Sequence, residues 1–311
     1  MHARPRPRHD LTPVVFRPPR ALGVIVGGGL VAWAVVGAGL AIQVAVGAPA
    51  EFKTLLAWAV AVVLAGLAVA FANWTYGLFS MAYVIDADNL TVECGFRRVV
   101  IPIASIQRMI PGRTLDEAHV EGLNWWGCHI GTADVKRVGY TMFYSTHSAP
   151  EELLYLVTSE AAYALTVLDQ AAFAEEIQGR AVVGAVQRVP QRSIATGLAA
   201  FPFWRDRVAI AMAGLSALAC LALGGYLLLQ YPGLPRVVQL NFPALGGVVR
   251  IGEKDELLRI IYLGVAVLAA NSVLGVLVHA RERAAGLWLF ASGGMLQAVL
   301  LAAAVTAVER S

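Results

Sequence analysis

The sequence predicts a membrane protein in which an α-helical bundle of five transmembrane spans carries an inserted all-β domain, a barrel or sandwich with one C-terminal helix. Two observations predict this mixed fold class. Of the 311 residues, 58% are hydrophobic and 14% are charged, whereas soluble domains average about a quarter charged residues. In addition, a stretch of alternating apolar and polar residues, 81–184, interrupts a series of long uncharged runs.

Five uncharged runs reach the roughly 17–25 residues that a helix needs to cross a bilayer. They are residues 22–46, 55–79, 208–229, 260–278 and 287–308. The first two predict a transmembrane hairpin over 21–80, and the last three predict a bundle over 208–311 with an outer loop at 231–259. Residues 1–20 are rich in Pro and Arg, which predicts a disordered basic tail.

Cationic residues cluster before the first and third spans and in the turn before the fifth. They are Arg4, Arg6, Arg8, Arg17, Arg20, Arg205, Arg207, Arg281 and Arg283. With five spans, all three clusters fall on one side, which the positive-inside rule identifies as the cytoplasm. We therefore expect a multi-pass protein of the cell inner (plasma) membrane whose residues 81–184 are cytoplasmic. Three widely spaced cysteines also suit a reducing compartment.

Alternation within residues 81–184 predicts a hairpin with its turn at 86–89, followed by further strands. The further strands are expected at residues 97–103, 140–146, 153–158 and 162–167. Asp169 is predicted to cap a helix that buries Phe173 and Ile177. The periodicity is lost over residues 113–137, which predicts a long irregular loop.

Three stretches follow the first two spans in order: YVIDADNLTVECGFRRVVIPIASI, GLNWWGCHIGT and FYSTHSAPEELLYLVTSEAAYALTVLDQAAFAEEI. This arrangement resembles the bacterial pleckstrin-homology (PH) domain of membrane proteins. The matching positions are Leu90, Ile101, Pro102, Ile106, Phe143, Tyr144, Thr146, Tyr163, Leu165, Asp169 and Phe173. The resemblance implies two orthogonal antiparallel sheets capped by a C-terminal helix.

Where eukaryotic PH domains bind phosphoinositides, Lys and Arg of the first hairpin loop contact the phosphates. Here that loop carries Asp86 and Asp88, whose carboxylates repel phosphate, so no specific phosphoinositide is expected. The outer stretch separately resembles the extracytoplasmic loop of an uncharacterised membrane domain. The positions behind that second resemblance are Pro235, Asn241, Gly246, Gly247, Gly252 and Lys254.

The candidate partner-binding residues are Asn124, Trp125 and Trp126, within the expected irregular loop. Aromatic side chains dominate the hot spots of protein interfaces, which favours a protein partner or a second copy of the chain. The alternative is that the two tryptophans pack the mouth of the domain against the membrane surface.

Two groups are candidates for contact with the membrane surface. The first is cationic and the second lies in an interfacial linker predicted over 185–207; together they are Arg97, Arg98, Lys136, Arg137, Phe201, Phe203 and Trp204. The alternative is that the cations form a solvated strand and loop face, and that the linker only leads into the third span.

No residue pattern favours catalysis. Cys128 and His129 are adjacent without a third orienting group, and Asp116, His119 and Glu121 lack a metal-ligand spacing. The spans hold no Asp, Glu, Lys, Arg or His, and polar residues such as Gln297 are expected to bond between helices.

We therefore expect a non-enzymatic interaction or scaffold module with no catalytic residue, metal, cofactor or nucleic acid partner. Its expected partners are the lipid bilayer and a protein. The alternatives are a membrane sensor or transporter-accessory protein that uses the outer loop 231–259, and a membrane enzyme that uses the loop 115–129.

Overall fold

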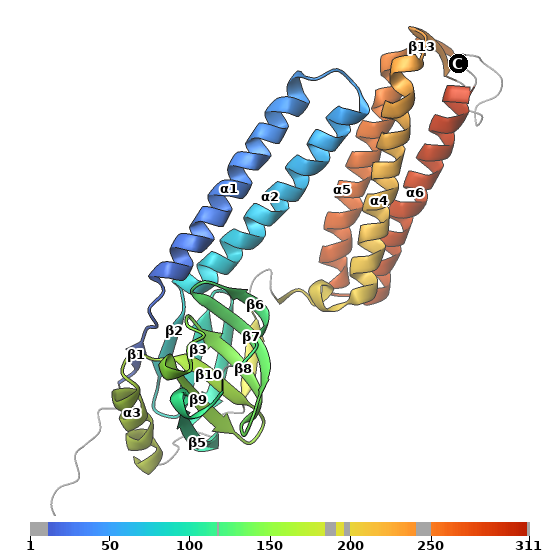
Figure 1. Cartoon of the computed structure of the whole chain (residues 1–311). Helices are drawn as coiled ribbons and strands as arrows, with labels where there is room; N and C mark the ends of the chain where they lie inside the picture. The colour runs from blue at the N-terminus through green and yellow to red at the C-terminus, as the bar shows by residue number, and fades with distance from the viewer. Residues whose placement is uncertain (1–11, 117, 184–190, 196–199, 241–249, 310–311) are drawn as a thin grey trace, which may run out of the picture. The chain divides into compact units, whose positions relative to one another are not determined.

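The computed structural model describes residues 12–116, 118–183, 191–195, 200–240 and 250–309 (Figure 1). The chain divides into two compact units, residues 1–35 with 66–200 and residues 36–65 with 201–311. The first unit contains the β-domain, by which we mean two β-sheets and the short helix that follows their last long strand. The second unit contains three long helices near the C-terminus.

Five long helices are apolar enough to cross a membrane. They are α1 (Ala21–Gly47), α2 (Phe52–Phe79), α4 (Arg207–Gln230), α5 (Leu258–His279) and α6 (Arg283–Glu309). All five predicted runs lie within these helices, so the prediction of five spans is confirmed. A set of such helices is typical of a multi-pass membrane protein.

Helices α4, α5 and α6 pack against one another around a shared apolar core. Polar side chains also join them. The amide of Gln297 in α6 donates to the carbonyl of Gly264 in α5 at 2.7 Å, and the hydroxyl of Ser216 in α4 donates to the carbonyl of Phe290 in α6 at 2.7 Å. The expectation that Gln297 bonds between helices is confirmed.

Two sheets form the β-domain. The five-stranded sheet has the order β1 (Val14–Phe16), β2 (Ala82–Ile85), β3 (Asn89–Cys94), β4 (Arg97–Pro102) and β11 (Arg192–Ala195). The six-stranded sheet has the order β5 (Ile106–Pro111), β9 (Leu153–Thr158), β10 (Ala162–Thr166), β8 (Gly139–Ser145), β7 (Cys128–Val135) and β6 (Glu121–Trp125). Strands β8 and β10 pair in parallel, whereas the other neighbours described here are antiparallel.

The domain's main core lies between the two sheets, because alternate residues of each strand point inward. In β3, for example, Leu90, Val92 and Cys94 are buried. Tyr83 of β2 links the sheets, since its hydroxyl donates to the carbonyl of Tyr144 in β8 at 2.7 Å. The sheets are not closed into a barrel, so the sandwich is the correct one of the two predicted forms.

The helix α3 (Gln170–Val183) closes the domain. The Asp169 carboxylate accepts the backbone N–H of Ala172 at 2.9 Å, which caps the first turn. Phe173 and Ile177 are almost fully buried in the core. Both the predicted cap and the predicted buried face are confirmed.

The prediction of an irregular loop over residues 113–137 is wrong, because β6 and β7 form an antiparallel hairpin within it. Glycines in these two strands interrupt the alternation of apolar and polar residues. Gly122 pairs with Gly131, and a Cβ atom on Gly131 would lie 2.2 Å from the carbonyl oxygen of Glu121. The backbones of the two strands approach so closely here that only glycine fits. The apolar residues that would show a period of two are therefore missing from these positions.

Two short strands extend the five-stranded sheet at its edges. Strand β1 pairs with β2, so the prediction of a disordered tail over 1–20 is wrong for residues 14–16; residues 1–11 lie outside the described part. Strand β11 lies within the predicted interfacial linker 185–207, and it pairs with β4. Neither segment is long enough to show a period of two, and each gains its backbone hydrogen bonds from a partner distant in sequence.

Candidate functional site where the domain meets the spans

Within the first unit, two turns of the β-domain pack directly on the ends of α1 and α2. In the β6–β7 turn, a Cβ atom on Gly127 would lie 2.4 Å from the backbone nitrogen of Gly23 in α1. In the β3–β4 turn, a Cβ atom on Gly95 would lie 3.1 Å from the Cα of Gly77 in α2. Gly127 and Gly95 have φ of 81° and 57°, which glycine adopts without steric cost. The domain therefore docks on the helix ends by close backbone contact.

Aromatic pairs surround these glycine contacts. Trp74 of α2 packs on Trp125 of β6 with ring centroids 5.8 Å apart. Tyr76 of α2 packs on Phe96 of the β3–β4 turn at 5.3 Å. Such pairs contribute about 0.5–1.5 kcal/mol beyond the area they bury. They hold the domain in one orientation on the end of an apolar helix.

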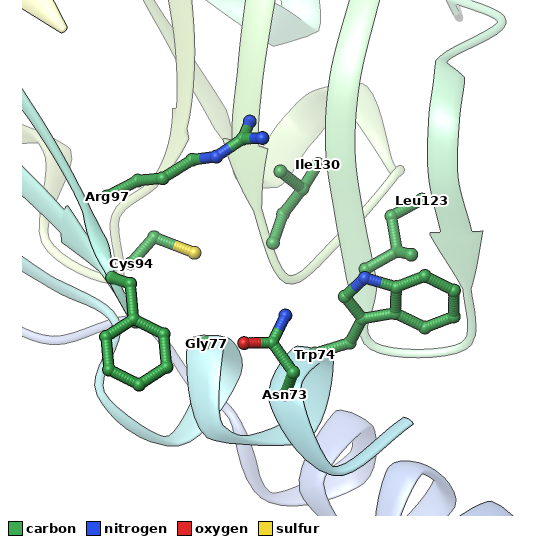
Figure 2. A pocket seen from close by; sticks show the side chains of 9 residues that line it. Asn73, Trp74, Gly77, Cys94, Arg97, Leu123 and Ile130 are labelled. Atoms are coloured by element: carbon green, nitrogen blue, oxygen red, sulfur yellow. The ribbon is translucent and has the colours of Figure 1, made fainter. Parts of the chain in front are cut away.

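A pocket of about 210 Å³ lies between the last turns of α2 and the domain (Figure 2). Its polar lining residues are Asn73, Cys94 and Arg97. Figure 2 shows the Asn73 amide, the Cys94 thiol and the Arg97 guanidinium directed toward one space. Leu123 of β6 and Ile130 of β7 line it with apolar side chains.

Arg97 gives the pocket a positive charge. Among the described residues Arg97 forms no ion pair, whereas the neighbouring Arg98 pairs with Glu93 at 3.1 Å. Burial raises the pKa of the Cys94 thiol to about 11 although Arg97 lowers it, so the thiol is neutral at physiological pH. None of the described residues that line the pocket carries a carboxylate. The site thus favours an anion.

Two sheets around a main core, closed by a C-terminal helix, agree with the arrangement that the resemblance implies, except that β8 and β10 pair in parallel within a sheet expected to be antiparallel. Residues 81–181 match the family model of the bacterial PH domain. The match confirms the resemblance and covers strands β2 to β10 and most of α3. It does not extend to β1 and β11, which are the edge strands of the five-stranded sheet, or to the five long helices. Comparisons with curated proteins and with solved structures gave no match.

The candidate partner-binding residues of the PH domain lie around the β6–β7 turn. Trp126 is 79% exposed. Trp125 is half-buried against Trp74, and its indole N–H is buried without a hydrogen-bond partner in the described part of the chain. The Asn124 side-chain oxygen is 2.7 Å from Nδ1 of His129. Asn124 is also exposed, so Trp126 is the more accessible of the two tryptophans for a partner.

The candidate cations of the PH domain do not form one surface. Arg97 lines the pocket beside α2. Lys136 and Arg137 lie in the β7–β8 turn, at the end of β7 remote from Gly127. An eight-residue strand separates the two ends by roughly 25 Å at about 3.3 Å per residue. Arg97 is therefore close to a span, whereas the other two are a strand's length away.

The aromatic candidates of the predicted linker belong to the second unit. Phe203 is only 8% exposed and packs on Phe290 of α6 with ring centroids 5.5 Å apart. Trp204 is 60% exposed, and Phe201 is half-buried. Phe203 thus belongs to the core at the end of the helices, and Trp204 is the candidate that a membrane surface can reach.

The residues weighed for catalysis are not arranged as a nucleophile and base. Cys128 and His129 are consecutive in β7, so their side chains point to opposite faces of the sheet. Burial raises the pKa of the Cys128 thiol to about 12 and lowers that of His129. A neutral thiol is a poor nucleophile. Asp116 lies 3.9 Å from Lys136, and His119 and Glu121 are exposed.

The described part of the outer loop 231–259 contains the antiparallel strands β12 (Val237–Leu240) and β13 (Arg250–Glu253). At its base the Tyr231 hydroxyl donates to the Asp255 carboxylate, and the Lys254 ammonium lies 4.6 Å from the centre of the Tyr231 ring. Asn241, Gly246 and Gly247, which carried the second resemblance, lie outside the described residues.

Sequence reasoning missed a charged cluster at the ends of α4, α5 and α6. Asp206 accepts the backbone N–H groups of Val208 and Ala209, which caps α4. Its carboxylate lies 2.6 Å from Nε of Arg283 and 3.5 Å from Nε2 of His279. The one local signal was an aspartate just before an apolar run. Both neighbours of the carboxylate, His279 and Arg283, follow more than 70 residues later.

Proposed function

We propose that this protein is a membrane-anchored PH-domain interaction or scaffold module without catalytic activity, displayed on the cytoplasmic face of the inner membrane. The observation that carries the proposal is the backbone contact of Gly127 with Gly23 and of Gly95 with Gly77. These contacts hold the PH domain directly on the ends of two apolar helices.

Such docking suits a module whose function is to hold a binding surface at the membrane. Holding a binding surface at the bilayer raises its effective concentration for partners that occupy the same surface. A fixed orientation also reduces the entropy that is lost on binding. The PH domain would then present the same face to every partner in the membrane plane.

The surface that we assign to a protein partner contains Trp126 and the exposed side of β6. Trp126 is 79% exposed, and β6 is an edge strand of its sheet. Edge strands present unpaired backbone groups that an added strand can satisfy, and an exposed tryptophan beside them supplies the apolar contact that hot spots use. The partner is a protein or a second copy of this chain.

Site-specific photocrosslinking in intact cells tests this assignment. A photoreactive residue at position 126 is expected to give a discrete adduct with a protein. The matched control is position 140, because Tyr140 is also an exposed aromatic residue of the same sheet, in β8. Adducts with lipid alone at position 126 would contradict the protein partner and favour packing of Trp126 on the membrane surface.

A second experiment separates this function from the sensor alternative. Purification of the full chain in mild detergent is expected to recover the crosslinked partner, with loss of that partner in Trp126→Ala. A chain lacking residues 241–249 is the comparison. Should that deletion release the partner while Trp126→Ala retains it, the outer loop would be the functional surface.

Cysteine accessibility tests the proposed orientation. Cys94 is buried, so a cysteine introduced for Tyr140 is the better reporter of the PH domain, and one introduced for the exposed Val237 reports the outer loop. A membrane-impermeant maleimide added to intact cells is expected to label position 237 and not position 140. The reverse pattern would invert the topology.

A further inference from the structure

We infer that the pocket lined by Asn73, Cys94 and Arg97 binds the phosphate of an anionic phospholipid from the leaflet beside the PH domain. This site does not include Trp126, and it does not depend on the partner proposed above. Four features of the pocket support it.

The first feature is depth in the membrane. The pocket wall includes Asn73, Trp74 and Gly77, which lie in the last two turns of the apolar helix α2 (Phe52–Phe79). Tryptophan and tyrosine collect where a span meets the head groups, and Trp74 and Tyr76 mark that level here. The pocket therefore opens at the height at which lipid phosphates lie.

The second feature is charge. The Arg97 guanidinium reaches the pocket and has no carboxylate partner among the described residues (Figure 2). Its planar donors match a phosphate in a bidentate manner. The Asn73 amide is directed into the same space and forms no hydrogen bond within the described chain. An isolated amide near the end of an apolar span gains a partner when a phosphate oxygen occupies the pocket.

The third feature is size. A pocket of about 210 Å³ is smaller than the roughly 300–1,000 Å³ of sites for drug-sized ligands. It admits a phosphate with part of its glycerol, whereas the acyl chains stay in the bilayer. The side chains of Leu123, Ile130 and Trp74 provide apolar contact for the glycerol carbons.

The fourth feature separates this site from the first hairpin loop of the PH domain. That loop carries Asp86 and Asp88 and lies at the opposite end of β3 from Cys94. Six residues of strand place the two ends roughly 20 Å apart at about 3.3 Å per residue. The anion site is thus at the end of the sheet that contacts α2, where the acidic loop does not repel phosphate.

The test measures lipid retained by the full chain in nanodiscs of phosphatidylcholine mixed with phosphatidylglycerol, by native mass spectrometry. Arg97→Gln is expected to reduce retained phosphatidylglycerol roughly fivefold or more. This factor corresponds to a loss of about 1 kcal/mol of binding free energy, the contribution of one cation near an anionic membrane surface. Arg98→Gln is the matched control, because Arg98 is the adjacent arginine and already pairs with Glu93. Its retention is expected to equal that of the wild type.

A second variant and a second ligand complete the experiment. Asn73→Leu removes the amide and narrows the pocket, so it is expected to lower retention while thermal stability is unchanged. Soluble glycerol phosphate added to the protein in neutral detergent is expected not to displace phosphatidylglycerol. Equal losses in the Arg97 and Arg98 variants would mean diffuse attraction and overturn the inference. Displacement by glycerol phosphate at equal concentration would overturn the lipid as the source of the phosphate.

Discussion

Gly23 and Gly127 meet backbone to backbone, since a Cβ atom on Gly23 would lie 2.2 Å from the carbonyl oxygen of Gly127. Gly23→Ala is therefore expected to force the PH domain away from α1, at a cost of about 1–3 kcal/mol, as for other overpacking substitutions. The measurement is the midpoint of thermal unfolding of the full chain in detergent. Gly28→Ala is the control, because a Cβ atom there meets nothing within 4 Å. Equal midpoints for the two variants would contradict the contact.

Phe16 links β1 to the domain core through Phe173, with the ring centroids 5.0 Å apart. Because Phe16 is only partly buried, Phe16→Ala is expected to cost about 2 kcal/mol, less than the 3–5 kcal/mol typical of a buried phenylalanine. Hydrogen exchange at the backbone amides of β2 measures the loss of pairing. Val15→Ala is the control, since Val15 is 50% exposed on the same strand. Unchanged exchange in Phe16→Ala would leave β1 without a stabilising role.

The Asp206 carboxylate predicts a pH dependence for the α4–α6 bundle. Its hydrogen bond with Arg283 is the main reason that the pKa of Asp206 falls from 3.8 to about 2. The stability that the ionised carboxylate contributes is therefore complete above pH 3.8 and is lost as the pH falls toward 2. Melting midpoints of the wild type and Asp206→Asn should differ at neutral pH and converge over that interval. Glu282→Gln, an exposed residue of the nearby turn, should show no such convergence.

Gln297 is fully buried and donates to the carbonyl of Gly264 at 2.7 Å. Gln297→Leu is expected to destabilise the bundle by about 0.6–2 kcal/mol, the range measured for hydrogen bonds between membrane helices. Unfolding in a mixed detergent titration measures the difference. Gln43→Leu tests the same exchange at an exposed position of α1 and is expected to be neutral. A larger effect at Gln43 than at Gln297 would contradict the assigned role.

The candidate site was only partly predictable. The residues Trp125 and Trp126 were identified from the sequence because aromatic side chains dominate interface hot spots, and Arg97 was identified as one of several cations that can contact anionic lipid. The sequence did not predict that Trp126 is exposed, that Trp125 packs on a helix or that Arg97 lines a pocket. Trp125 packs on Trp74, which is 51 positions earlier, and Arg97 lines a pocket whose other walls come from α2, β6 and β7. Such contacts depend on pairings between distant segments, and no local pattern encodes them.

The sequence by itself determined the five spans, the presence of a PH domain between the second and third of them, and the Asp169 cap. Each of these is a local property: the length of an uncharged run, a period of two, or an aspartate at the start of a helix. Only the tertiary structure decided that residues 121–135 form a hairpin, that Val14–Phe16 joins a sheet, and that Gly127 meets Gly23. Glycine has no side chain with which to mark a strand or a contact. The contribution of a glycine to packing can be assigned only when the position of the backbone against which it packs is known.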